Sequence, residues 1–266
     1  MQGKGDAVFV SEYKRLGNGL EFLSVSQTIL KLSLEKDAQK NWDRFYKRNS
    51  SNFFKDRNWT KKEIQHLCGD VALNDNLLFL DAGCGCGNTI FPLTKCFPNW
   101  GFYGIDFSKN AIDLLEKRSE ETGANVKSTV FDLTSKNISE LDFPQMDLIS
   151  LVFVLSTISK EGQIEVIKNI RKLLKPKGSV IVRDYGANDH AMTRFGRNSK
   201  IDERFYARQD GTRVYYFLTG KIHCGYSTYE CNYVHRTTEN LKEGINFVRT
   251  FVEGRFIKNT EENYKL

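Results

Sequence analysis

LLFLDAGCGCGNTI, residues 77–90, is the stretch that decides the fold of this chain. Its apolar run ends at Asp81, and Gly83, Gly85 and Gly87 follow before a pattern compatible with a helix. This order is typical of a buried strand that passes into a helix through a ligand-binding loop, because glycines lack the Cβ that would block close approach. An ordinary tight turn would explain one or two of these glycines. The full set predicts a nucleotide-binding strand, loop and helix.

A second strand, 101–105, ends at Asp106, which follows Gly87 by 19 positions. An acidic residue at this place in a βαβ unit accepts hydrogen bonds from ribose hydroxyls. The glycines lack the third position of the dinucleotide fingerprint, and Asp81 would repel a pyrophosphate but attract a sulfonium group. The pattern therefore favours S-adenosylmethionine over NAD.

Composition limits the class of protein. The chain has 266 residues, 40% hydrophobic and 27% charged, which is enough for one large globular core. Its formal charge of +6 suits a polyanionic partner. No apolar run approaches the roughly 20 residues of a membrane span. The six cysteines contain no C-x-x-C pair, so we expect neither a metal site nor a disulfide framework. This cysteine usage favours a reducing compartment, so we expect the protein in the cytoplasm and also in the nucleus.

Strand and helix patterns alternate along the chain. Further strands are expected at 126–131, 146–154 and 179–182, and helices from 88, at 108–118 and at 163–174. This alternation predicts an α/β, Rossmann-like, doubly wound and mostly parallel sheet with a ligand crevice at the carboxyl ends of its strands. The residues that share that location are Gly83, Asp106, Asp132, Leu133 and Val152 to Phe153.

The domain organisation is expected to have three parts. Residues 1–34 are interpreted as a poorly ordered tail, 35–70 as a helical lid and RNA-contacting segment, and 71–266 as the main domain, with a basic and aromatic insertion at about 184–213. A helix at 35–49 places Trp42, Phe45 and Tyr46 on one face. The aromatic and basic stretch NFFKDRNWT, 52–60, follows it and contains Lys55 and Arg57. These aromatics could pack on the core or stack on a base.

Several stretches together resemble the tRNA (cytosine-3) N-methyltransferase family of methyltransferase-like proteins, which are class I S-adenosylmethionine-dependent methyltransferases. The similar stretches lie between 38 and 217: AQKNWDRFYKRNSSNFFKDRNW, LDAGCGCGN, GIDFS, FDLT, LVFVLSTI, LLKPKGSVIVRDYGANDHAMTRF and FYARQDGTRVYYF. The FYKRNSxNFFKDRxW string is most similar to the branch that acts on serine tRNAs. The resemblance implies methylation of an anticodon-loop cytidine, at position 32, with seryl-tRNA synthetase as a partner.

The resemblance also implies roles for single residues. Gly83 would contact the cofactor, Asp106 would hold its ribose, and Asp132 and Leu133 would flank its adenine. Val152 would line the same pocket, while Trp42 and Tyr46 would close over it, as a cofactor lid rather than as core.

The chemistry of cytosine indicates what else the site needs. Its N3 is unprotonated at neutral pH, so catalysis is mainly alignment, and a carboxylate near the cationic product would stabilise it. Asp184 and Asp189, after the fifth strand, are the candidates, although ordinary turn chemistry would also explain them. The expected RNA-binding residues are basic and lie among aromatics: Lys55, Arg57, Arg183, Arg194, Arg204, Arg208 and Arg213.

The segment 217–233 departs from the family. The family has a full helix there, whereas LTGKIHCGYSTYECN has no amphipathic helical pattern and is several residues shorter. Strands are expected at 246–253 and 255–258. Two other classes stay open: a methyltransferase for a small molecule or protein, and a tRNA-binding subunit with weak or no activity.

Overall fold

The computed structural model describes residues 9–10, 25–49, 55–57, 60–222, 225–240 and 244–260. A seven-stranded sheet forms its centre, in the order β11-β12-β6-β5-β2-β3-β4. The four contacts among β2 to β6 are parallel, and β12 joins β6 antiparallel. The strands are β2 (Leu78–Ala82), β3 (Gly101–Asp106), β4 (Val126–Val130), β5 (Met146–Val152), β6 (Leu174–Tyr185), β11 (Tyr226–Asn240) and β12 (Ile245–Lys258). The predicted fold class is confirmed.

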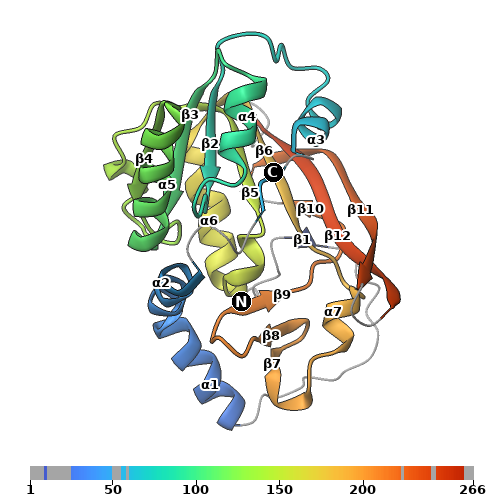
Figure 1. Cartoon of the computed structure of the whole chain (residues 1–266). Coiled ribbons are helices and arrows are strands. Elements are labelled where there is room, and N and C mark those ends of the chain that lie inside the picture. Colours follow the sequence, from blue (N-terminus) through green and yellow to red (C-terminus); the bar gives the residue numbers. More distant parts are fainter. Residues whose placement is uncertain are drawn as a thin grey trace.

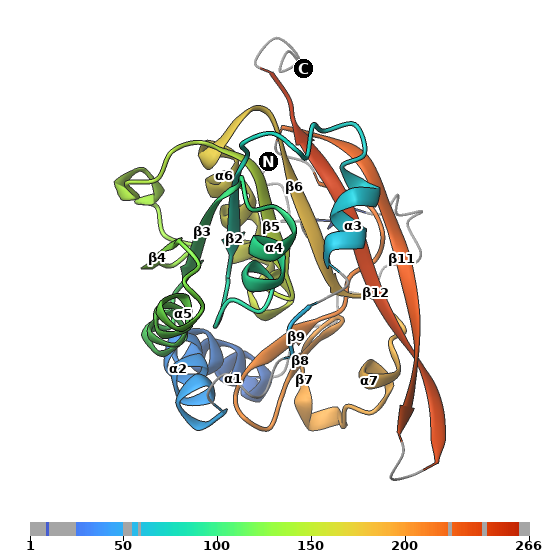
Figure 2. The same cartoon turned by 45° about the horizontal axis from the view of Figure 1, so that its top comes forward.

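Alternating side chains of the strands pack on two helical layers. Phe79, Leu148 and Ile181 face the layer of α3 (Thr60–Leu67), α4 (Ile90–Cys96) and α5 (Lys109–Thr122). Leu80, Ile149 and Val180 face α6 (Lys160–Leu173), on the opposite side of the sheet. Because successive residues of a strand point to opposite faces, these continuous apolar runs fill both layers. Figures 1 and 2 show α3 and α4 together on one face.

The N-terminal segment and the insertion lie together at one end of the sheet (Figures 1 and 2). The first comprises α1 (Val25–Lys36) and α2 (Ala38–Asn49). The second comprises α7 (His190–Thr193) and a small antiparallel sheet of β7 (Lys200–Asp202), β8 (Phe205–Ala207) and β9 (Arg213–Tyr215). The described residues also contain three 3₁₀ turns: Ile138–Glu140, Leu155–Thr157 and Arg197–Ser199.

The N-terminal boundary predicted at residue 34 is wrong. Helix α1 crosses it, and the single helix predicted at 35–49 is two helices that meet at Asp37. The polar stretch before Ala38 has no strong helical period, so the sequence pattern missed α1. Residues 1–8 and 11–24 of the expected tail lie outside the described residues.

The C-terminal part forms a long hairpin. As the sequence predicted, the described residues of the segment 217–233 contain no helix. Within this segment, β10 (Lys221–Ile222) pairs with β1 (Phe9–Val10). The two strands predicted at 246–253 and 255–258 are one strand, β12. Gly254 allows this continuity, because a Cβ there would lie 2.6 Å from the Glu230 carbonyl, next to a register shift in β11. Only 251–257 of β12 pair with β6, so the hairpin tip extends beyond the sheet. No described helix has the length and apolar character that a bilayer span requires.

Candidate active site

Two joined cavities lie at the carboxyl ends of the parallel strands. One of about 260 Å³ is lined by Gly83, Asp106, Asp132 and Leu133. The other, of about 570 Å³, is lined by Asp81, Val152, Tyr185 and Arg208. The residues that line both are Trp42, Tyr46, Gly83, Phe153 and Thr157. All seven residues predicted to bind the cofactor therefore line this paired cavity.

The glycine loop has the backbone that a ligand cradle needs. Gly83 has φ +79° and Gly85 has φ +53°, a region that favours glycine. A Cβ on Gly83 would collide with Val154, and one on Gly85 with the Tyr46 hydroxyl. Burial raises the pKa of Tyr46 well above its ordinary value, and the Asp106 carboxylate adds to this effect. The phenol therefore stays protonated and is available as a hydrogen-bond donor.

Asp106 is prepared to bind hydroxyl groups. Its two carboxylate oxygens accept N–H bonds of 2.9 Å from Gly85 and Ser108, and each oxygen retains a second acceptor site. Burial raises its pKa to about 6, against the opposing effect of those two N–H groups. Donors such as ribose hydroxyls would offset this desolvation, so the residues present fit S-adenosylmethionine.

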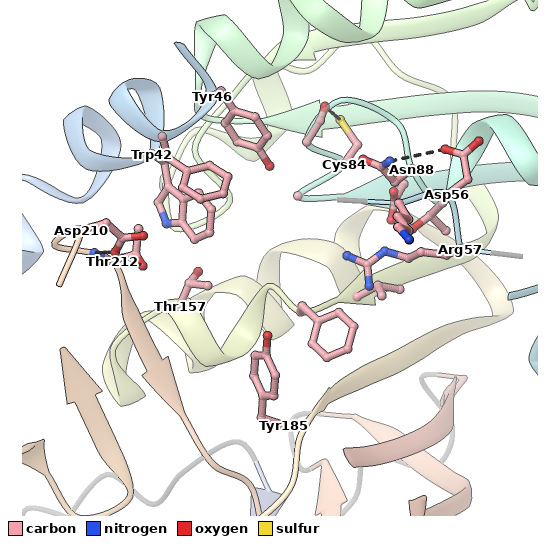
Figure 3. A pocket seen from close by; sticks show the side chains of 18 of the residues that line it. Trp42, Tyr46, Asp56, Arg57, Cys84, Asn88, Thr157, Tyr185, Asp210 and Thr212 are labelled. Atoms are coloured by element: carbon pink, nitrogen blue, oxygen red, sulfur yellow. Dashed lines mark hydrogen bonds between the residues drawn. The ribbon is translucent and has the colours of Figure 1, made fainter. Parts of the chain in front are cut away.

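Helix α2 forms a lid between the two halves of the site. On one side, Asp43 accepts a 2.6 Å bond from the Ser108 hydroxyl at the start of α5. On the other side, Asn41 donates to the Gly211 carbonyl at 2.9 Å. Trp42 and Tyr46 point from this helix into the cavity (Figure 3), 6.0 Å apart between ring centroids. The predicted lid role of both residues is consistent with this geometry.

The larger cavity has aromatic walls and cationic groups. Phe153 and Tyr185 lie 4.9 Å apart between centroids. The Arg57 guanidinium lies 4.7 Å from the Phe153 centroid, and that of Arg208 lies 5.6 Å from the Tyr185 centroid. Phe153 has φ +59°, which is unusual for a bulky residue and is typical of a functional site. Sequence patterns cannot show such strain, so the sequence placed Phe153 at the crevice without assigning it a role.

Two of the predicted RNA-binding arginines are buried, which favours a structural role for them, and their contact with RNA stays a prediction. Arg183 is 3% exposed, and its guanidinium binds Glu63 at 3.2 Å and Glu253 at 2.6 Å. Arg213 is 4% exposed and pairs with Glu35. Both arginines lie in strands, where successive side chains point to opposite faces. The spacing of basic residues in the sequence does not show which of the two faces is buried.

The other predicted RNA contacts differ in their surroundings. Lys55 and Arg194 are exposed, and Lys55, Arg57 and Arg208 line the larger cavity. Arg204 bonds Tyr215 at 3.2 Å and pairs with Glu203, within the small sheet. Phe53, Phe54 and Trp59 lie outside the described residues. Four exposed cations of α2 were not predicted as RNA contacts: Lys40, Arg44, Lys47 and Arg48.

Asp184 and Asp189 are fully buried and do not line either cavity. Asp184 accepts N–H bonds of 2.9 Å from Ser156 and Tyr185. Asp189 begins α7 and accepts from the Thr250 amide at 2.7 Å and from Arg249 at 2.9 Å. This geometry favours the turn-forming role over contact with a base, and their catalytic role stays a prediction.

Comparisons with known proteins show the family to which the chain belongs. A family model described as a methyltransferase domain matches residues 80–180. The rat tRNA N(3)-cytidine methyltransferase METTL6 is 44% identical over 233 residues, covering 85% of this chain and 81% of the rat protein. The tRNA N(3)-methylcytidine methyltransferase trm141 of Schizosaccharomyces pombe is 38% identical over 231 residues, covering 83% and 92%. A solved SAM-dependent methyltransferase from Anabaena variabilis shares the fold, with a TM-score of 0.59, 16% identity and coverage of 84% and 95%.

The sheet order, the glycine cradle and Asp106 define a class I methyltransferase whose cofactor is S-adenosylmethionine. Within that class the identities above are decisive. The chain belongs to the tRNA N(3)-cytidine methyltransferase family.

Proposed function

We propose that this chain transfers a methyl group from S-adenosylmethionine to N3 of an anticodon-loop cytidine, position 32, of serine tRNA. The observation that carries the proposal is the paired cavity. Its smaller part has the buried carboxylate of Asp106, and its larger part has the aromatic walls of Phe153 and Tyr185. A cofactor and a flat base can therefore be held side by side.

The residues act by alignment. When bound, the cofactor supplies an electrophilic methyl group on sulfur. Cytosine N3 already has a lone pair, so the protein needs no base to remove a proton. Trp42 and Tyr46 cover the junction of the two cavities and exclude water, while Phe153 and Tyr185 fix the plane of the ring. Geometry and exclusion of water are thus the contributions of the chain.

Access to N3 requires an unpaired base. N3 lies on the pairing edge, so the cytidine must leave any stack or pair before it enters a pocket. Arg57 and Arg208 at the cavity, and Lys40, Arg44 and Lys47 on the outer face of α2, can contact phosphates on either side of the extruded nucleotide. We attribute RNA affinity to this set instead of Arg183 and Arg213.

The choice of serine tRNA and the partnership with seryl-tRNA synthetase form the finer part of the proposal. The FYKRNSxNFFKDRxW string supports it through its similarity to the serine branch. A single small domain has little surface with which to read a whole tRNA, so a synthetase would supply that selectivity.

The test is methyl transfer from labelled S-adenosylmethionine to total tRNA, with and without seryl-tRNA synthetase, followed by nucleoside analysis. We expect 3-methylcytidine, in serine tRNA, at a rate raised by the synthetase. A different methylated product would favour a small-molecule or protein methyltransferase. RNA binding without any transfer would favour a tRNA-binding subunit. Equal rates with and without the synthetase would contradict the partnership alone.

A further inference from the structure

Three aspartates line the larger cavity, and they differ in what their oxygens already bind. Asp56 accepts two bonds from Arg118, at 2.8 and 2.6 Å. Asp81 is 2% exposed and accepts a 2.5 Å bond from the Ser150 hydroxyl. Asp210, in the loop between β8 and β9, is exposed, and it uses Oδ1 to accept from the Thr212 amide at 2.9 Å and the Thr212 hydroxyl at 2.7 Å. Its Oδ2 has no hydrogen-bond partner among the described residues.

The loop holds this carboxylate in a fixed place. The Arg208 amide donates to the Thr212 carbonyl at 2.8 Å, and the Gly211 amide donates back to the Arg208 carbonyl at 3.0 Å. The bond from Asn41 to the Gly211 carbonyl ties the loop to the lid. In Figure 3, Asp210 and Thr212 lie near Trp42 and Thr157, on the side of the cavity opposite Arg57.

The polar groups of this end of the cavity match the edge of cytosine. Cytosine presents an N4 amino donor beside N3 and an O2 acceptor on the other side of N3. A carboxylate accepts from the amino group, and the neighbouring Arg208 can donate to O2. Uracil presents an O4 acceptor where cytosine has its amine, so the same carboxylate would repel it.

We propose that Asp210 reads the N4 amino group of the target cytosine through Oδ2 and provides the counter-charge for the methylated base. In the reaction the N3 lone pair forms the new bond to the methyl carbon, and the electron pair of the broken carbon–sulfur bond stays on sulfur. No proton moves, so the positive charge of the sulfonium passes to the base and is shared between N3 and N4. A carboxylate at N4 stabilises that charge. This inference rests on the proposed function and assigns to Asp210 the role expected of Asp184 and Asp189.

The test compares two anticodon stem–loop RNAs that differ only at the target nucleotide: one has cytidine and the other has zebularine, which keeps N3 and O2 but lacks the amino group. The full chain and two variants are assayed for kcat/KM on both. Asp210→Ala removes the carboxylate, and Asp210→Asn keeps a side-chain oxygen for Thr212, so the loop is preserved. Gln209→Ala, an exposed neighbour in the same loop, is the matched control.

We expect the wild-type chain and the control to prefer cytidine by about 5- to 150-fold, the range for one specific base contact. Asp210→Ala should reduce this ratio to the intrinsic preference that the N4 amino group confers on N3 without a carboxylate; the loss is expected on cytidine, with transfer to zebularine almost unchanged. Asp210→Asn should retain part of the preference. Equal losses on both RNAs, or an unchanged ratio, would overturn the inference while the proposed function stands. No transfer to cytidine RNA by the wild-type chain would overturn both.

Discussion

Asn41 in the lid helix and Gly211 in the β8–β9 loop are joined by a 2.9 Å hydrogen bond across 170 positions of sequence. The same helix is bonded to the start of α5 through Asp43 and Ser108. The lid therefore connects the half of the site that binds the cofactor with the half that lines the base cavity. Cofactor and RNA binding should depend on each other through this helix.

The bond between lid and loop can be broken by one methyl group. Gly211 has φ +81°, and a Cβ there would lie 2.8 Å from the Asn41 amide nitrogen. We expect Gly211→Ala to cost about 1–3 kcal/mol of backbone strain and to weaken both cofactor and RNA binding, measured by calorimetry. Gly196→Ala is the control, since a Cβ there meets nothing within 4 Å. Unchanged affinities in Gly211→Ala would show that the lid does not couple the two halves.

Asp106 should be essential for the cofactor but not for the fold. Asp106→Ala removes the only side chain we assign to the ribose, so binding of S-adenosylmethionine should fall below detection in calorimetry. Circular dichroism should show an unchanged secondary structure. Asp113→Ala, which removes an exposed carboxylate of α5 that pairs with Lys109, should bind normally. Normal affinity in Asp106→Ala would refute the ribose assignment.

Cofactor affinity should depend on pH through the same carboxylate. Burial raises the pKa of Asp106 from 3.8 to about 6, so the free protein protonates it as the pH falls below about 6. Ribose hydroxyls donate to the charged form, so the affinity should be constant above pH 7 and should fall by up to about tenfold per pH unit below 6. The stability of the cofactor-free protein should depend on pH in the opposite direction. The pKa of Asp106 is higher in the folded than in the unfolded chain, so this carboxyl group lowers the free energy of unfolding as the pH rises from about 4 to 6. An Asp106→Asn variant with the same pH profile as wild type would contradict this account.

Substitutions of Arg183 and Arg208 should affect different properties, the first stability and the second RNA binding. Arg183→Ala leaves Glu63 and Glu253 buried without their shared partner, so we expect a loss of about 3–5 kcal/mol in the free energy of unfolding. Arg208→Ala should change stability far less, but it should weaken RNA binding and reduce its salt dependence. Denaturant titration and RNA binding at several salt concentrations measure both. A normal salt dependence in Arg208→Ala would remove Arg208 from the RNA surface.

Asp189 is expected to position a wall of the cavity. It binds Arg249, whose guanidinium lies 5.7 Å from the centroid of Tyr185. Asp189→Asn should therefore lower the melting temperature and raise KM for RNA, with kcat reduced less than about tenfold. The catalytic alternative predicts a large fall in kcat at an unchanged melting temperature, so the two parameters distinguish the roles.

The sequence predicted which strand-end residues line the smaller cavity, because that half of the site depends on local signals. Gly83, Asp106, Leu133 and Val152 lie at or just after the carboxyl ends of predicted parallel strands, and those ends must meet at one edge. The sheet could be predicted for the same reason.

The base half could not be predicted in this way. The burial of Arg183 depends on partners from α3 and β12, at positions 63 and 253, that no local pattern connects. The strain at Phe153 and the orientation of Asp210 are properties of the folded chain. The Asp-Gly pair in the RQDGTR stretch is typical of a turn, but the sequence does not show that this turn lies at the cavity.

The proposed function requires that N3 of one extruded cytidine receives the methyl group. The most direct measurement is mass spectrometry of nucleosides from a serine tRNA transcript treated with the chain, seryl-tRNA synthetase and cofactor labelled in the methyl group. A matched transcript has uridine at the single target position. We expect labelled 3-methylcytidine from the first transcript and no labelled nucleoside from the second. Label at another atom or base, or equal labelling of both transcripts, would contradict the proposed function.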